Sequence, residues 1–142
     1  MSPTAPAQHK NKTFATFLAL LLGGLGAHRF YLRGSVDRLG LLHVASVPIA
    51  GLMYGLAPQA DWFFKILPVL LSFIAGYVET LVIGLMSDDK FDAAFNAHSG
   101  RKSDSIWVLA LLLVATMMVG STVLIAMMAR LFDLLATSGA YG

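Results

Sequence analysis

Long uncharged runs, separated by short polar segments, dominate the sequence. A stretch of about 18 or more apolar residues is long enough to cross a bilayer as a helix. Three runs meet this length, over residues 39–60, 62–86 and 105–129, and only Lys65 and Glu79 carry charge within them. We therefore expect transmembrane helices over 39–57, where Ala57-Pro58 closes the first run, and over 62–86 and 105–131.

A fourth uncharged run, residues 13–27, reaches only about 22 Å as a helix, which is too short for a span. Continuing it to Leu32 gives about 30 Å and places Arg29, Phe30 and Tyr31 at the headgroup level, where such residues settle. We expect a helix over 13–32, and hence an all-α integral membrane protein with a bundle of four transmembrane helices. The alternative, a cleaved signal peptide, is disfavoured because cleavage would remove a ladder of small residues suited to helix packing.

The polar segments divide the chain. Residues 1–12 contain two Pro and are expected to form a flexible tail, 13–87 a membrane domain, 88–104 a polar loop, 105–135 a fourth helix with its flank, and 136–142 a short tail. In the loop, Ser87 is placed to cap a short amphipathic helix near 88–97 that lies on the membrane. One face of that helix would carry Phe91 and Phe95, and a solvated face would carry Asp88, Asp92 and Asn96. The start of the last helix offers Ser103, Asp104 and Ser105 as N-caps.

Composition supports a membrane protein and excludes several functions. Apolar residues make up 57% of the 142 residues and charged residues 13%, about half the charged share of a soluble domain. A net charge of +2 without a dense basic stripe gives no reason to expect nucleic acid binding. No pairing of nucleophile and base, phosphate loop or metal-ligand spacing is present, so we expect no enzyme activity, no cofactor and no metal.

Small residues recur at helical spacing, as in membrane helices that pack closely. The run 13–32 carries one ladder, the run 62–86 a second, and the run 39–57 a pair. These are Ala15, Ala19, Gly23 and Ala27, then Ser72, Gly76, Thr80 and Gly84, then Gly51 and Gly55. The two matched ladders predict that helix 13–32 docks on helix 62–86.

Glu79 is the clearest functional candidate, because an ionisable residue inside a span costs about 2.5–3.5 kcal/mol. It lies roughly 12 Å from the nearer helix end. Side chains lean toward the helix N-terminus, so Arg29 or His28 is expected to reach Glu79. We prefer an ion pair that fixes helix register, and keep a proton or cation site as the alternative. His43 lies near a helix start and is expected at the interface.

Lys and Arg set the expected orientation, since cytoplasmic loops are enriched in them. In a four-span topology six of them follow the first and third helices, against four on the other side. The six are Arg29, Arg33, Arg38, Lys90, Arg101 and Lys102, and the four are Lys10, Lys12, Lys65 and Arg130. This count favours non-cytoplasmic termini at both ends of the chain.

The string Gly23-Gly24-Leu25-Gly26-Ala27-His28-Arg29-Phe30-Tyr31-Leu32 resembles the start of the two-transmembrane-helix (TM-2) domain family, called NINE proteins in bacteria. The resemblance spans roughly residues 10–87. It implies a first helix that ends in this motif, a short cytoplasmic linker, and a second hydrophobic segment with an acid near its end, to which Glu79 is similar. Arg33 replaces the family's Gly. Either the helix over 39–57 is an insertion into the family's layout, or the second helix of the family is split between 39–57 and 62–86.

The resemblance implies residence in a bacterial inner membrane and little chemistry of its own. With the lipid bilayer as solvent, we expect an accessory, scaffold or regulatory role toward another membrane protein, or a homo-oligomer. The candidate functional residues are Glu79, His28, Arg29, Phe30 and Tyr31. The alternative is a small transporter or channel subunit in which Glu79 is the titrating group.

Overall fold

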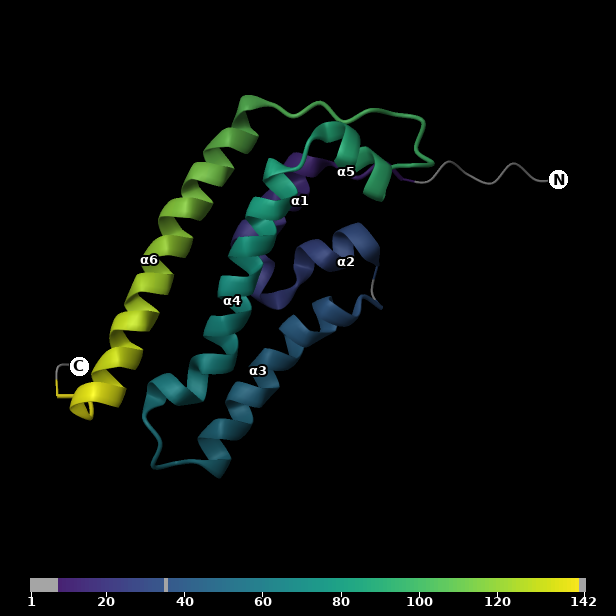
Figure 1. Cartoon of the computed structure of the whole chain (residues 1–142). Helices are drawn as coiled ribbons and strands as arrows, with labels where there is room; N and C mark the ends of the chain where they lie inside the picture. Colours follow the sequence, from purple (N-terminus) through teal and green to yellow (C-terminus); the bar gives the residue numbers. More distant parts are fainter. Residues whose placement is uncertain (1–7, 35, 141–142) are drawn as a thin grey trace.

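The computed structural model describes residues 8–34 and 36–140, and every regular element in these ranges is helical (Figure 1). In chain order they are α1 (Lys12–Leu22), the 3-10 helix η1 (Gly23–Leu25), α2 (Ala27–Arg33), α3 (Arg38–Leu56), α4 (Trp62–Leu85), α5 (Asp88–Phe95) and α6 (Trp107–Thr137). Of the described helices, α3, α4 and α6 are long and apolar enough to cross a membrane. The predicted helices over 39–57, 62–86 and 105–131 are therefore present, the last extended to Thr137.

The expected continuous helix over 13–32 is wrong. The chain leaves α1 at Leu22, passes through η1, and reverses at Gly26, which has a left-handed backbone with φ of 71°. A residue with a Cβ is disfavoured there, both by this backbone conformation and because a Cβ would lie 2.8 Å from the Gly40 carbonyl oxygen. The α1–η1 segment, about 20 Å long, cannot cross a bilayer. The predicted four-span bundle is thus corrected to three candidate spans and a hairpin.

We call residues 12–33 the re-entrant hairpin, because α2 returns beside α1. The Tyr31 hydroxyl accepts a hydrogen bond from the Asn11 N–H at 2.8 Å, and the rings of Phe14 and Tyr31 meet edge to face at 5.2 Å. The turn of the hairpin lies near the middle of α4, where the Ser72 hydroxyl donates to the Gly24 carbonyl at 2.7 Å. Irregular backbone at membrane depth requires such internal partners, since lipid offers none.

The two ladders of small residues lie along the contact between α1–η1 and α4. Ala15, Ala19 and Gly23 are buried on one side, and Ser72, Gly76, Thr80 and Gly84 on the other. A Cβ on Gly76 would lie 2.6 Å from the Gly23 carbonyl carbon, so the two backbones are in direct contact. Ala27 lies beyond the turn, on α2, and does not extend the ladder of α1.

The third small-residue pair lies elsewhere. Gly51 and Gly55 are exposed on α3, and a Cβ at either position would meet nothing within 4 Å. They therefore form no close helix contact within the described residues, and their predicted role in helix packing stays a prediction. They lie on the outer side of α3, away from its buried residues Gly40, His43, Ser46 and Ala50.

A polar cap closes the end of the bundle where the hairpin begins, and we define it as residues 8–11, α5 and the loop 96–105. The Lys10 N–H donates to the Asn96 side chain at 2.7 Å, and His9 Nδ1 lies 3.0 Å from the Ser99 hydroxyl. Residues 8–11 are therefore held by the loop and do not form the expected flexible tail. The other residues of that predicted tail, 1–7, lie outside the described residues, as do 141–142 at the other terminus.

The amphipathic helix predicted near 88–97 is present as α5, with Ser87 as its N-cap and Phe91 fully buried. Its acidic face is not solvated as expected. Asp92 accepts from the Ser103 N–H at 2.6 Å, and Asp88 accepts from the Ser105 N–H at 2.9 Å. Both serines are therefore used by α5, and they do not cap α6, which begins after Ile106 without a side-chain cap.

The two ends of the described chain lie at opposite ends of the bundle (Figure 1). His9 contacts the loop that follows α5, whereas Arg130, near the end of α6, pairs with Asp61 between α3 and α4 at 3.0 Å. Because the number of candidate spans is odd, the described chain begins at one end of the bundle and finishes at the other. The expectation of both termini on one side followed from the fourth span and does not fit this arrangement.

Candidate functional site

Glu79 of α4 is held by two side chains of the re-entrant hairpin. The Arg29 Nε–H lies 2.9 Å from each carboxylate oxygen, and a terminal nitrogen of the same guanidinium also bonds Oε1. His28 Nε2 lies 2.6 Å from Oε2. The structure therefore brings together Glu79, His28 and Arg29, three of the five predicted functional residues.

Arg29 continues the network to the start of α3. Its remaining terminal nitrogen lies 3.2 Å from Asp37 Oδ1, and that oxygen also accepts the Gly40 N–H at 2.7 Å as the N-cap of α3. The Gly40 N–H and the Arg29 guanidinium hold the pKa of Asp37 below its usual range. One guanidinium thus connects the hairpin, α3 and α4.

His43 approaches the same carboxylate from α3, with its Nε2 3.5 Å from Glu79 Oε2. Its Nδ1 lies 2.7 Å from the Ser72 hydroxyl. Because that hydroxyl donates its only proton to the Gly24 carbonyl, it accepts from His43, which therefore carries a proton on Nδ1. In the neutral ring, Nε2 then presents a lone pair toward Glu79.

His28 differs from His43 in its proton position. Its Nε2 donates to Glu79, and its Nδ1 is buried without a hydrogen-bond partner among the described residues. In the neutral ring this Nδ1 is an unpaired acceptor, whereas protonation would leave a buried unpaired donor. The bond to Glu79 therefore fixes a proton on Nε2.

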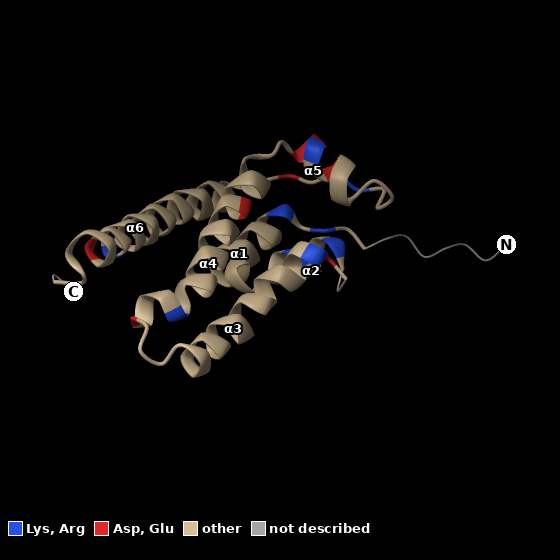
Figure 2. Ribbon diagram, turned by 60° about the horizontal axis from the view of Figure 1, so that its bottom comes forward, with Lys and Arg blue, Asp and Glu red and all other residues tan. Residues whose placement is uncertain are grey.

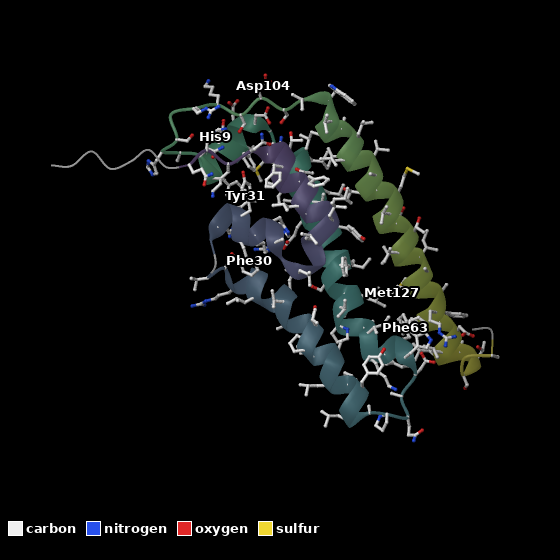
Figure 3. The ribbon with its side chains drawn as sticks, turned by 180° about the vertical axis from the view of Figure 1, so that it is seen from behind. His9, Phe30, Tyr31, Phe63, Asp104 and Met127 are labelled. Carbon is white, nitrogen blue, oxygen red and sulfur yellow. The ribbon has the colours of Figure 1, made fainter. Side chains whose placement is uncertain are left out.

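The other two predicted residues, Phe30 and Tyr31, both labelled in Figure 3, pack against neighbouring elements and take no part in the hydrogen bonds described for Glu79. The Phe30 ring lies against Gly40, where a Cβ would approach it to 2.7 Å. Tyr31 binds Asn11, and the Lys10 ammonium lies 5.0 Å from its ring centre. Both aromatic residues join α2 to neighbouring segments.

Grooves border Glu79 on two sides. One, of about 130 Å³, lies between α2, α4 and α5 and includes Arg33 and Phe95 in its lining. The other, of about 320 Å³, lies between α3 and α4 and is apolar except for His43, Ser46, Ser72 and Glu79. No group of three His, Cys, Asp or Glu within the described ranges is arranged to hold a metal ion.

Sequence reasoning missed the roles of His43 and Asp37. His43 was expected at the interface but is buried, and it forms with Gly40, Ser46 and Ala50 the inner stripe of α3. That spacing of small and polar residues three to four apart was the available signal. Asp37, three residues before Gly40, has the position of an N-cap.

The first third of the chain is similar to a known domain family. Residues 8–54 match the TM2 domain, which here comprises the hairpin, α3 up to Tyr54 and the segment that leads into α1. No curated protein and no solved structure matches the chain significantly. The match is shorter than the expected 10–87 and includes most of α3, which argues against α3 as an insertion. Glu79 lies outside it, so its correspondence to the family's acid stays a prediction. The similarity to the TM2 domain thus covers residues 8–54 and leaves α4, α5 and α6 outside it.

Proposed function

We propose that this TM2 protein is an accessory or scaffold component for another membrane protein, and that Glu79 anchors its re-entrant hairpin. The observation that carries the proposal is that Arg29 and His28 of the hairpin bond both carboxylate oxygens of Glu79. A carboxylate bound by an always-charged guanidinium is a fixed structural pair. The network of Glu79, Arg29 and His28 then holds the hairpin inside the bundle.

The outer side of α3 supplies a surface for a partner. Gly51 and Gly55 are one turn apart there, with open space around both, and exposed Val47 and Leu52 flank them. In lipid, helices associate where small residues let backbones approach closely. A membrane helix of the partner is therefore proposed to pack on this face.

The charge distribution gives a proposed orientation. Eight of the ten Lys and Arg lie toward the end of the bundle with the polar cap and α2, where Figure 2 shows most of the coloured segments. The other two, Lys65 and Arg130, lie toward the opposite end. Because cytoplasmic segments are enriched in Lys and Arg, we propose that the polar cap faces the cytoplasm and the end of α6 the opposite side of the membrane. A bacterial inner membrane is the proposed location, on the strength of the family resemblance.

Co-purification tests the accessory role. The tagged protein is isolated in mild detergent from its native host, and bound membrane proteins are quantified by mass spectrometry. We expect a stoichiometric partner that is lost with Gly51→Leu plus Gly55→Leu, because the added side chains keep the backbones apart. The control Ala126→Leu plus Ala129→Leu adds bulk to exposed positions of α6 and should retain the partner. Absence of any partner, or equal loss in the control, contradicts the proposal.

One observation favours the alternative of transport. His28 and His43 both face Oε2 of Glu79 beside the groove between α3 and α4, close to a re-entrant segment. Irregular backbone and ionisable groups at membrane depth are features of ion pathways. Reconstituted Glu79→Gln discriminates the two. A pH-dependent proton or cation flux that this variant abolishes, with normal protein level, supports transport. A lower protein level or partner yield without flux supports the accessory role.

A further inference from the structure

Two adjoining pockets lie between the start of α1 and the segment that enters α6. The first, of about 230 Å³, is polar and is lined in part by His9, Arg101 and Lys102. The second, of about 490 Å³, is mainly apolar, with Phe14, Phe17 and Ile106 in its lining. The two share Asn11, Thr13 and Asp104, so the polar pocket opens directly into the apolar groove. Figure 3 shows His9 and Asp104 at this same end of the molecule.

The polar pocket carries excess positive charge. Arg101 and Lys102 are exposed and form no ion pair within the described residues, while Lys12 is already paired with Asp88 at 2.9 Å. Asp104 is the acid in the lining, which it shares with the two unpaired cations and the imidazole of His9. This charge balance suits a monoanion.

The position of the two pockets relative to the membrane follows from α6. Trp107, at its first turn, is 73% exposed, and exposed indoles settle at the headgroup level. Arg101 and Lys102 precede Trp107 on the polar side, whereas Val108 and Leu112 follow it and line the groove. The polar pocket thus lies at headgroup depth, and the groove extends into the acyl-chain region between α1 and α6.

We propose that the two pockets together bind one anionic phospholipid. Arg101 and Lys102 contact its phosphate, and one acyl chain lies in the groove against Phe14, Phe17 and Leu112. Basic pockets beside membrane helices bind anionic headgroups by this charge complementarity. The apolar groove identifies a lipid, because free phosphate makes no contact with an apolar surface. The cations disfavour phosphatidylcholine, whose headgroup has no net charge and ends in a positive choline ammonium.

Native mass spectrometry of the full chain in detergent tests the site, with phosphatidylglycerol and phosphatidylcholine of identical acyl chains as probes. We expect preferential retention of phosphatidylglycerol. Arg101→Gln plus Lys102→Gln should lower its affinity by about fivefold for each charge removed. The matched control, Arg38→Gln plus Lys90→Gln, removes two exposed charges that line neither pocket and should leave the preference unchanged. An equal fall in both double variants, or equal retention of the two lipids, overturns the proposal.

Further arms separate the lipid from a free anion. Leu112→Trp and, independently, Val108→Phe fill the groove and should reduce retention of phosphatidylglycerol while the thermal midpoint in detergent stays near that of the parent. Inorganic phosphate at millimolar concentration should not displace the lipid. Displacement by phosphate, or full retention in both groove variants, would assign the pocket to a small anion and refute the lipid site.

Discussion

Arg29 and Glu79 join the returning arm of a re-entrant hairpin to the long helix beside it, with the Arg29 Nε–H 2.9 Å from both carboxylate oxygens. Because the same guanidinium also contacts Asp37, it holds three elements in one register. Lys has one ammonium group and lacks the planar fork that contacts two carboxylates at once. The arginine at this position therefore serves geometry as well as charge.

Removing either member of this pair is expected to destabilise the fold. Arg29→Gln leaves the partly buried Glu79 carboxylate without its guanidinium partner, whereas Glu79→Gln leaves Arg29 with Asp37 alone. Loss of one partner costs about 3 kcal/mol for a buried pair, and less here because Glu79 is partly exposed and Arg29 keeps Asp37. The double variant should lose less than the sum of the single losses. Thermal midpoints of the four proteins in one detergent give this coupling, with exposed Arg38→Gln as the control. Additive losses would show that the two side chains do not act as a pair.

The close backbone contact between Gly76 of α4 and Gly23 of η1 should not tolerate an added side chain. In Gly76→Ala the new Cβ would lie 2.6 Å from the Gly23 carbonyl carbon, so α4 and η1 must separate. Overpacking of this kind costs about 1–3 kcal/mol. Gly51→Ala, in open space on α3, should be neutral or stabilising by about 0.5–1 kcal/mol, because Ala favours the helix. Unfolding of both variants in the same detergent checks the difference, and a Gly76→Ala protein as stable as the parent would contradict the close contact.

The sequence predicts much of the fold because hydropathy and spacing are local properties. The three long helices, the N-cap at Ser87 and the opposed small residues of α1 and α4 all follow from such patterns. The reversal at Gly26 does not, because an apolar run with Gly also suits a continuous membrane helix. The turn is stabilised over a continuous helix by Gly40 of α3 and Ser72 of α4, which contact it from other helices. A local pattern does not show these contacts.

Only part of the candidate site, Glu79 with Arg29 and His28, could be predicted from local sequence patterns. Glu79 is conspicuous because a charge within an apolar run is costly, and Arg29 is the nearest basic residue on the expected side. His43 reaches Glu79 from α3, on whose inner side it is buried, with Nε2 3.5 Å from Oε2. A position near a helix start does not reveal this. The error over 13–32 also put both termini on one side of the predicted bundle, whereas the two ends of the described chain lie at opposite ends.

The polar cap should loosen in acid. Donation by the Asn96 amide and then by the Ser103 hydroxyl and N–H lowers the pKa of Asp92 to about 2. The Ser105 hydroxyl and then Lys12 also lower the pKa of Asp88. A carboxyl whose pKa is lowered on folding stabilises the fold fully above its unfolded pKa, near 4, and this contribution is lost as pH falls toward about 2.

Hydrogen exchange of the Ser103 and Ser105 amides, corrected for intrinsic rates, checks the acid response. Protection should decline between about pH 4 and about pH 2, because protonated carboxyls no longer hold these N–H groups. Asp92→Asn should lose protection at Ser103 already at pH 6. Asp89→Asn, on the exposed side of the same helix, serves as the charge-matched control and should follow the parent. Unchanged protection down to pH 2 would argue against these bonds.

The hairpin makes a topological prediction that a four-span bundle cannot share. The chain has no Cys, so single cysteines at exposed Gln8, His98, Gln59 and Ala140 report their own side of the membrane. If residues 12–33 turn back within the bilayer, Gln8→Cys and His98→Cys lie on one side, and Gln59→Cys and Ala140→Cys on the other. With the polar cap in the cytoplasm, a membrane-impermeant maleimide added to whole cells should label only the second pair. A continuous first span would instead place residue 8 opposite residue 98, so labelling of Gln8→Cys together with Gln59→Cys would refute the re-entrant path.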